Sequence, residues 1–262
     1  MKALLQAVPS GQVPVPPEKR FLITISIITV CRNEEANIRR TCESVCSQTV
    51  ADSEWIVIDG ASTDGTLDIL SEYKDRIGVM VSEPDRGIYD AMNKGVARAS
   101  GRYLIFLNGG DRFADNDVLK TAAGASGAGI LYGDLIFERP DGSRELKRFP
   151  DALSRRWLLK HMMPHQSSFI KRELFERYGN YDTSFRIAGD YDLFVRLLHV
   201  EKVSALHLPE PIAVFNGDGV SSNPEFRALR KMENHRVRKT YFPAYRWSLK
   251  AWRQELRNLS RR

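Results

Sequence analysis

The chain has 262 residues, of which 42% are hydrophobic and 10% aromatic, so it can bury the core of one α/β domain and is not an intrinsically disordered protein. Its net charge of +6 indicates an anionic partner, and its three cysteines, which lack the spacing of zinc ligands, indicate reduced thiols in a cytoplasmic protein. No apolar run approaches the roughly 20 residues of a membrane-spanning helix, and the proline-rich segment 1–20, a flexible N-terminal arm, lacks the pattern of a signal peptide.

The first predicted strand is the almost uninterrupted apolar run 21–30, whose β-branched residues suit a strand covered on both faces. A helical pattern around residues 38–46 and a second apolar strand at 55–59 complete a βαβ unit. The same alternation continues with a helix at 66–73, a strand at 79–82, a helix at 88–99 and a strand at 103–107. Such alternation predicts a Rossmann-like, doubly wound and mostly parallel sheet.

The second half of the chain has a less regular pattern. Strand-like segments at 130–137 and 144–149 flank a turn, and they indicate mixed or antiparallel pairing. A helix is expected at 190–199, and two short apolar runs flank Pro209 and Pro211.

These elements predict one domain at residues 21–222, with a regular half at 21–115 and a less regular half at 116–222, followed by a basic helical tail at 223–262. Four polar clusters, NEE, DGASTDGT, EPDRG and NGGD, follow predicted strand ends. Because ligands of parallel sheets bind beyond the carboxyl ends of the strands, we expect all four clusters to face one crevice.

Five segments carry a resemblance to a known family: ISIITVCRNEEANI, WIVIDGASTDGT, RGIYDAMNKGVARASGRYLIFLNGGDRF, HQSSF and AGDYDLFVRL. In this order and spacing they resemble family-2 glycosyltransferases of the GT-A fold over roughly residues 22–200, and in particular the LNxGD branch that builds bacterial surface polysaccharides. The resemblance implies an inverting transfer from a nucleotide-sugar donor of the UDP or GDP type to a glycan or lipid-linked acceptor. It also implies that residues 21–115 form the nucleotide-binding half of the domain and residues 116–222 the acceptor half.

The NGGD loop is the expected cation site, because a divalent cation can neutralise the charge of a diphosphate leaving group. In the family this loop often reads DxDD, whereas here Asp111 is the one carboxylate and Asn108 offers a carbonyl oxygen. Mg²⁺ or Mn²⁺ can be held by so few protein oxygens when the diphosphate and water supply the rest. The alternative is a β-turn without a ligand.

The resemblance places Arg32, Glu34 and Asp59 around the nucleotide, with Asn108 beside them, although the family's second acid after Asp59 is Gly60 here. The following STDGT segment also makes a good turn and helix cap without any ligand. For Asp90, contact with the donor sugar competes with stabilisation of the helix that begins near it.

The resemblance also assigns Asp190 of AGDYDL as the base that takes the proton of the acceptor hydroxyl, although the acid that precedes it in the family is Gly189 here. Asp192 competes for this role, and Asp190 alternatively caps the helix. His165 contacts the diphosphate or the acceptor, unless it is a buried histidine satisfied by backbone groups.

The tail carries twelve Lys or Arg residues against three Glu between residues 225 and 262. Four apolar residues in helical spacing face away from its basic residues: Leu249, Trp252, Leu256 and Leu259. This helix packs on the domain, lies through residues 245–262 on an anionic membrane at the cytoplasmic face, or binds another partner. We expect no nucleic acid, and the membrane alternative predicts that truncation before residue 245 releases the protein from vesicles without lowering its melting temperature much.

A function from another class stays open, namely a non-catalytic module that binds a nucleotide or a glycan. Glycine stands at three positions where the family carries acids, at residues 60, 110 and 189. A binding module has no turnover to lose, so separate substitutions of Asp111 and Asp190 distinguish it from an enzyme.

Overall fold

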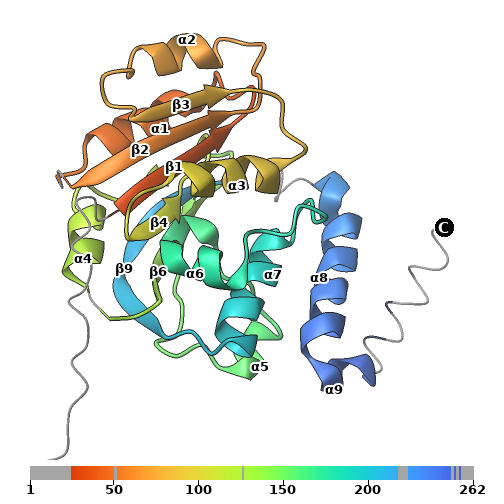
Figure 1. Ribbon diagram of the computed structural model, residues 1–262. Helices are drawn as coiled ribbons and strands as arrows, with labels where there is room; N and C mark the ends of the chain where they lie inside the picture. Colours follow the sequence, from red (N-terminus) through yellow and green to blue (C-terminus); the bar gives the residue numbers. More distant parts are fainter. Residues whose placement is uncertain are drawn as a thin grey trace, which may run out of the picture.

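The computed structural model describes residues 25–49, 52–125, 127–217 and 224–248, together with residues 251 and 254. The arm predicted at residues 1–20 lies outside these described residues. Within them, a nine-stranded sheet forms the centre of the molecule and helices cover both of its faces (Figure 1).

The first four strands of the chain form the parallel half of the nine-stranded sheet. The strands are β1 (Ile25–Cys31), β2 (Ser53–Asp59), β3 (Val79–Ser82), β4 (Tyr103–Phe106), β5 (Arg112–Phe113), β6 (Ile130–Glu138), β7 (Arg144–Lys147), β8 (Ser168–Lys171) and β9 (Ala205–Asn216). Their order is β3-β2-β1-β4-β8-β6-β9-β5, with β7 paired to β6. Strands β1 to β4 are parallel, as are β6 and β9, whereas β5, β7 and β8 pair antiparallel. The predicted mostly parallel α/β sheet is confirmed.

The helices form two layers, one on each face of the sheet. They are α1 (Ile38–Cys46), α2 (Thr66–Ser71), α3 (Ile88–Arg98), α4 (Val118–Gly124), α5 (Arg155–Leu158), α6 (Arg172–Tyr178), α7 (Gly189–Val195), α8 (Arg227–Tyr241) and α9 (Pro243–Arg246). Short turns are η1 (His165–Ser167), η2 (Arg196–Val200) and η3 (Pro224–Phe226). On β1, Ile27 packs in the core with α1, α2 and α4, while Ile28 packs in the core with α3, α6, α7 and α8. Burial on both faces explains the uninterrupted apolar run.

Strand β9 differs from the sequence prediction, because it runs through both prolines as one strand. The register with β6 pairs Gly133 with Leu208 and then Asp134 with Pro211, so Pro209 and Glu210 are skipped. A bulge of this kind accommodates a residue that has no N–H to donate to the ladder.

Helix α8 packs against the rest of the domain beside α7 (Figure 1). Val237, Phe242, Tyr245 and Ala251 are buried in the same core cluster as residues of the parallel strands. The described part of the tail therefore belongs to the domain core, whereas the four stripe residues Leu249, Trp252, Leu256 and Leu259 lie outside the described residues. In the described parts of the chain, no helix combines the length and the apolar character needed to cross a membrane.

Candidate functional site

Three of the predicted polar clusters meet at one edge of the sheet. Beyond the strand ends, Gly60 N–H donates to Cys31 O at 2.9 Å, and Gly109 N–H donates to Val30 O at 3.0 Å. The loops after β1, β2 and β4 are thus tied together at the carboxyl ends of the parallel strands, where such folds bind ligands.

The NGGD loop has room for one carboxylate. A Cβ atom at Gly109 would lie 2.8 Å from Glu34 Cγ, and one at Gly110 would lie 2.8 Å from Asn216 Nδ2. Gly110 also has a φ of +92°, in the left-handed region that favours glycine. An acid at position 110 would collide with Asn216, so the loop keeps Asp111 alone.

His165 lies between Asn108 and Asp190 and contacts both side chains. Its Nδ1 is 2.6 Å from Asp190 Oδ2, and its Nε2 is 3.0 Å from Asn108 Nδ2. In the neutral tautomer that fits both contacts, Nδ1–H donates to Asp190 and Nε2 accepts the amide N–H. Burial by itself lowers the pKa of His165, but the Asp190 carboxylate, through its charge and its hydrogen bond, raises that pKa above its ordinary value. The partners of His165 are thus two predicted site residues rather than backbone groups.

Asp190 and Asp192 point to different surroundings. Asp190 is 7% exposed, and no described residue forms a hydrogen bond with its Oδ1. Asp192 accepts the hydroxyl of Tyr241 at 3.0 Å and lies 3.8 Å from Arg196 Nε, so it joins α7 to α8. The helix cap is Ala188, which leaves Asp190 in the first turn. Asp190 is therefore the acid that faces His165 and the NGGD loop.

Asp111 is buried beside the same histidine. Its Oδ1 accepts the N–H of Asn216 at 2.9 Å, and burial raises its pKa to about 6 although this hydrogen bond and His165 lower it. The carbonyl oxygen of the Asn108 side chain is also buried and has no hydrogen-bond partner in the described structure. Over the described residues, no three His, Cys, Asp or Glu side chains converge as a metal site. Two hard oxygen ligands thus lie in this loop.

Asp59 organises the loop that follows β2. Its Oδ2 accepts the N–H of Ser62 at 3.0 Å and the hydroxyl of Ser82 at 2.6 Å, and its Oδ1 accepts the hydroxyl of Ser62. Asp64 accepts the N–H of Thr66 at 3.1 Å, as expected for a turn, whereas the N-cap of α2 is Gly65 and the predicted side-chain helix cap is absent. Internal hydrogen bonds therefore hold the STDGT segment as a turn. Both carboxylate oxygens of Asp59 accept such bonds, so a nucleotide contact of Asp59 would be made in addition to them.

The other residues predicted for the donor side have different degrees of exposure. Arg32 is exposed, whereas Glu34 is half-buried next to the Asn37 amide, at 3.4 Å, and burial raises the pKa of Glu34. Asp90 accepts the backbone N–H of Arg86 and its guanidinium, both at 3.1 Å, which lower its pKa. These contacts of Asp90 stabilise the start of α3.

Sequence reasoning missed Asp85 and Lys94, which lie beside Gly60. Lys94 Nζ forms an ion pair with Asp85 and another, at 2.9 Å, with Glu83. A Cβ atom at Gly60 would lie 3.0 Å from Asp85 Oδ2, so a carboxylate from another loop stands next to the position where the family carries its second acid. The signal was present, because Asp85 belongs to the EPDRG cluster that follows a predicted strand.

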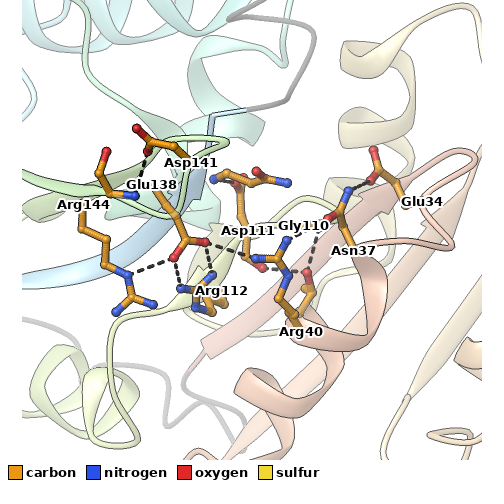
Figure 2. Close-up of polar contacts among 12 residues, drawn as sticks. Glu34, Asn37, Arg40, Gly110, Asp111, Arg112, Glu138, Asp141 and Arg144 are labelled. Carbon is orange, nitrogen blue, oxygen red and sulfur yellow. Dashed lines mark hydrogen bonds and ion pairs between the residues drawn. The ribbon is translucent and has the colours of Figure 1, made fainter.

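Three arginines surround Glu138 close to the NGGD loop (Figure 2). Glu138 lies 2.7 Å from Arg112 Nη2, 2.9 Å from Arg144 Nε and 3.1 Å from Arg40 Nη1, and Arg112 directly follows Asp111. Hydrogen bonds from Arg112 and Arg144 and the charges of both lower the pKa of Glu138 to about 2. The ion-pair cluster joins α1, β5, β6 and β7, and no local sequence pattern indicates it.

We expect Glu138→Gln to lower the free energy of unfolding by roughly 2–3 kcal/mol at pH 7. Because the folded-state pKa lies below the ordinary value of 4.5, this stabilisation is complete above pH 4.5 and is lost as the pH falls toward 2. Urea unfolding at several pH values measures it. The exposed pair of Glu145 with Arg139 supplies the control, since Glu145→Gln should cost less than about 1 kcal/mol. A difference that does not shrink below pH 4.5 would contradict the electrostatic origin.

Comparison with known proteins gives matches along most of the chain. The model of the family described as glycosyl transferase family 2 matches residues 26–179. An uncharacterized glycosyltransferase of Mycobacterium tuberculosis (strain ATCC 25618 / H37Rv) is 36% identical over 224 residues, which are 80% of this chain and 82% of that protein. A PGL/p-HBAD biosynthesis glycosyltransferase of Mycobacterium bovis (strain BCG / Pasteur 1173P2) is 32% identical over 209 residues, 76% of this chain and 78% of that protein.

Solved structures share the fold at low sequence identity. S. aureus TarS in complex with UDP-GlcNAc matches with a TM-score of 0.64 and 17% identity, covering 82% of this chain and 66% of that one. Mannosyltransferase PcManGT from Pyrobaculum calidifontis, in complex with GDP-Man and Mn²⁺, matches with a TM-score of 0.63 and 17% identity, covering 84% and 64%. The chain thus spans about two thirds of the length of these GT-A proteins, and the likeness shows the fold.

Proposed function

The chain belongs to glycosyl transferase family 2, and on that premise we propose that it moves a sugar from a nucleoside diphosphate to a glycan or lipid-linked acceptor, with inversion, in polysaccharide biosynthesis. The observation that carries the proposal is the state of Asp190. One oxygen of this buried carboxylate is held by His165, and the other has no partner in the described structure.

In the proposed reaction the acceptor hydroxyl attacks the anomeric carbon, a new C–O bond forms, and the bond to the diphosphate breaks. Asp190 takes the hydroxyl proton at Oδ1, and because this oxygen is buried, the acceptor must displace the groups that cover it to come within hydrogen-bond reach. His165 fixes the orientation of the carboxylate through Nδ1, and the protein thereby holds the base in position before the acceptor binds.

Asp111 and Asn108 are the residues that would hold a divalent cation. The fit rests on the single carboxylate of the loop and on the Asn108 carbonyl oxygen, which is buried without a partner among the described residues. Two protein oxygens suffice for Mg²⁺ or Mn²⁺ only when the substrate diphosphate supplies further ligands. Such a cation neutralises charge on the leaving diphosphate.

The donor is proposed to be a UDP or GDP sugar, with Arg32, Glu34 and Asp59 near its nucleoside. Two proteins of the same fold support this class, since the solved structure of TarS contains UDP-GlcNAc and that of PcManGT contains GDP-Man. Asp85 lies close enough to Gly60 to take part in the same contact. The Asp90 carboxylate accepts the backbone N–H of Arg86. We therefore propose that Asp90 stabilises the start of α3 and affects the donor sugar only indirectly.

The experiment that tests this function is a screen of nucleotides and nucleotide sugars by thermal shift, with and without Mn²⁺, followed by product analysis with the donor that binds. A ligand of the native state raises the melting temperature. Inversion is read from the anomeric configuration of the product by NMR. Binding without turnover on any glycan or lipid-linked acceptor would instead support the non-catalytic module.

We further propose that the protein works at the cytoplasmic face of an anionic membrane, to which the tail binds. Trp247 is 91% exposed at the end of α9, Arg246 is exposed on α9, and Arg227, Lys231 and Lys239 are exposed on α8. Each basic side chain near such a surface contributes about 1 kcal/mol, and a buried aromatic ring adds an apolar contribution.

Trp247→Ala should remove the fraction of vesicle binding that persists at high salt, because electrostatic attraction is screened at about 1 M salt and ring insertion is not. Co-sedimentation with vesicles of phosphatidylcholine, with and without phosphatidylglycerol, measures this. Leu146→Ala, which changes an exposed apolar residue of β7, is the control. The small effect on the melting temperature predicted for truncation before residue 245 is not expected from the structure. Tyr245 and Ala251 are buried in the core, so their removal should lower the melting temperature. Equal binding by the Trp247 variant and the wild type at high salt would exclude the insertion.

A further inference from the structure

Glu233 of helix α8 makes an unusual set of contacts with the loop that carries Asp190. Its carboxylate accepts three consecutive backbone N–H groups, from Arg186 at 2.9 Å, Ile187 at 2.9 Å and Ala188 at 2.8 Å. The side chain is 6% exposed. Ala188 directly precedes α7, so the three donors end two residues before Asp190.

This loop has no room for an acid of its own. A Cβ atom at Gly189 would lie 2.6 Å from the ring of Tyr89, which excludes the residue that precedes the base elsewhere in the family. The Tyr89 hydroxyl donates to Ile187 O at 2.8 Å and accepts the N–H of Asp190 at 3.4 Å. The backbone around Asp190 is therefore held by α3 on one side and by Glu233 on the other.

We propose that Glu233 is a positioning residue for Asp190, and that α8 thereby belongs to the catalytic apparatus. The proposal rests on the proposed function, in which Asp190 is the base. Glu233 fixes the backbone before α7, and His165 fixes the carboxylate at 2.6 Å, so the reacting oxygen is oriented before the acceptor arrives. A loose loop would misplace this oxygen, and misplacement of a reacting group by about 1 Å can cost a rate factor of roughly 10².

Glu233→Gln tests this role with little change in shape. The amide offers one carbonyl acceptor and turns an NH₂ group toward backbone donors, so at least one of the three N–H groups loses its partner. We expect kcat to fall roughly 10- to 100-fold, while KM for the donor and the Kd of the nucleoside diphosphate stay within about two-fold of wild type.

Tyr241→Phe is the matched control. It removes another α7–α8 hydrogen bond, from the Tyr241 hydroxyl to Asp192, and leaves Glu233 intact. We expect a similar drop in melting temperature for both variants but a loss of kcat only for Glu233→Gln. A wild-type kcat in Glu233→Gln, or equal losses of kcat in both variants, would overturn the positioning role.

A second readout does not depend on activity. Amide hydrogen exchange of the segment 183–192 should be faster in Glu233→Gln and unchanged in Tyr241→Phe, because only the first variant frees the backbone donors. Unchanged exchange in Glu233→Gln would also overturn the proposal. If Asp190→Asn keeps its turnover, the assignment of Asp190 as the base has failed, and the exchange data still decide whether Glu233 holds the loop.

Discussion

Asp190→Asn is expected to lower kcat by roughly 10²- to 10⁴-fold, the range that general-base catalysis contributes. Asparagine has nearly the shape of aspartate, and its carbonyl oxygen can still accept Nδ1–H of His165, which lies 2.6 Å from Asp190. The amide cannot take a proton from the acceptor hydroxyl. Because the substitution leaves the NGGD loop and the donor side intact, we expect the Kd of the nucleoside diphosphate to change by less than about three-fold. Initial rates and isothermal titration measure the two effects.

Asp192→Asn is the control for this prediction. Asp192 is as buried as Asp190, with both residues 7% exposed, but it contacts Tyr241 and Arg196 instead of His165. Its loss should lower the free energy of unfolding by about 1–3 kcal/mol and leave kcat near the wild-type value. Near-wild-type turnover in Asp190→Asn, with the fold intact by circular dichroism, would remove Asp190 as the base.

The parallel half of the sheet could be predicted because its signal is local. Each central strand is an apolar, β-branched run with both faces buried, and each helix between the strands shows its own periodicity. The strand predicted at 79–82 and the helix predicted from residue 88 begin where β3 and α3 begin. Such runs need no knowledge of distant residues.

The second half depends on contacts between distant residues, and there the sequence was less informative. Proline normally interrupts a strand, so Pro209 and Pro211 hid the continuity of β9, which depends on a bulge against β6. The role of α8 could not be predicted either, because it also depends on contacts between residues that are distant in the sequence. Glu233 is 45 residues from Ala188, the last of its three donors, and nothing in the basic tail marks it as different from a surface acid.

For the candidate site, residue types could be predicted but their pairing could not. Asn108, His165 and Asp190 were each selected from a separate motif, and the structure joins them in one hydrogen-bonded chain across 57 and 25 residues of sequence. The glycines at 60, 110 and 189 appeared in the sequence as missing acids. Gly189 faces the buried ring of Tyr89 and Gly110 has a φ of +92°, so a side chain is disfavoured at both positions, whereas the nearest atom at Gly60 is the end of the Asp85 side chain.

Asp111→Ala is expected to raise the Kd of the nucleoside diphosphate at least about ten-fold in Mn²⁺ and to change it little in EDTA. The reason is that Asp111 is the one carboxylate of the NGGD loop, and hard divalent cations require oxygen ligands. Because Asp111 also accepts the N–H of Asn216 at 2.9 Å, alanine loosens the loop as well. Asp111→Asn separates the two effects, since its carbonyl oxygen keeps the Asn216 hydrogen bond and only the charge is lost.

Both variants should therefore lose metal-dependent affinity, while only the alanine variant should lose appreciable stability, by about 1–3 kcal/mol for the unpaired backbone N–H. Asp115→Asn is the control, because Asp115 is an exposed acid of the following loop that accepts the N–H of Asp117 at 2.8 Å and should leave the Kd unchanged. Isothermal titration measures the Kd of each variant and of the wild type, in Mn²⁺ and in EDTA. Equal affinities in both conditions for wild type and Asp111→Asn would show that Asp111 serves the turn alone, and that the diphosphate is neutralised by protein cations instead.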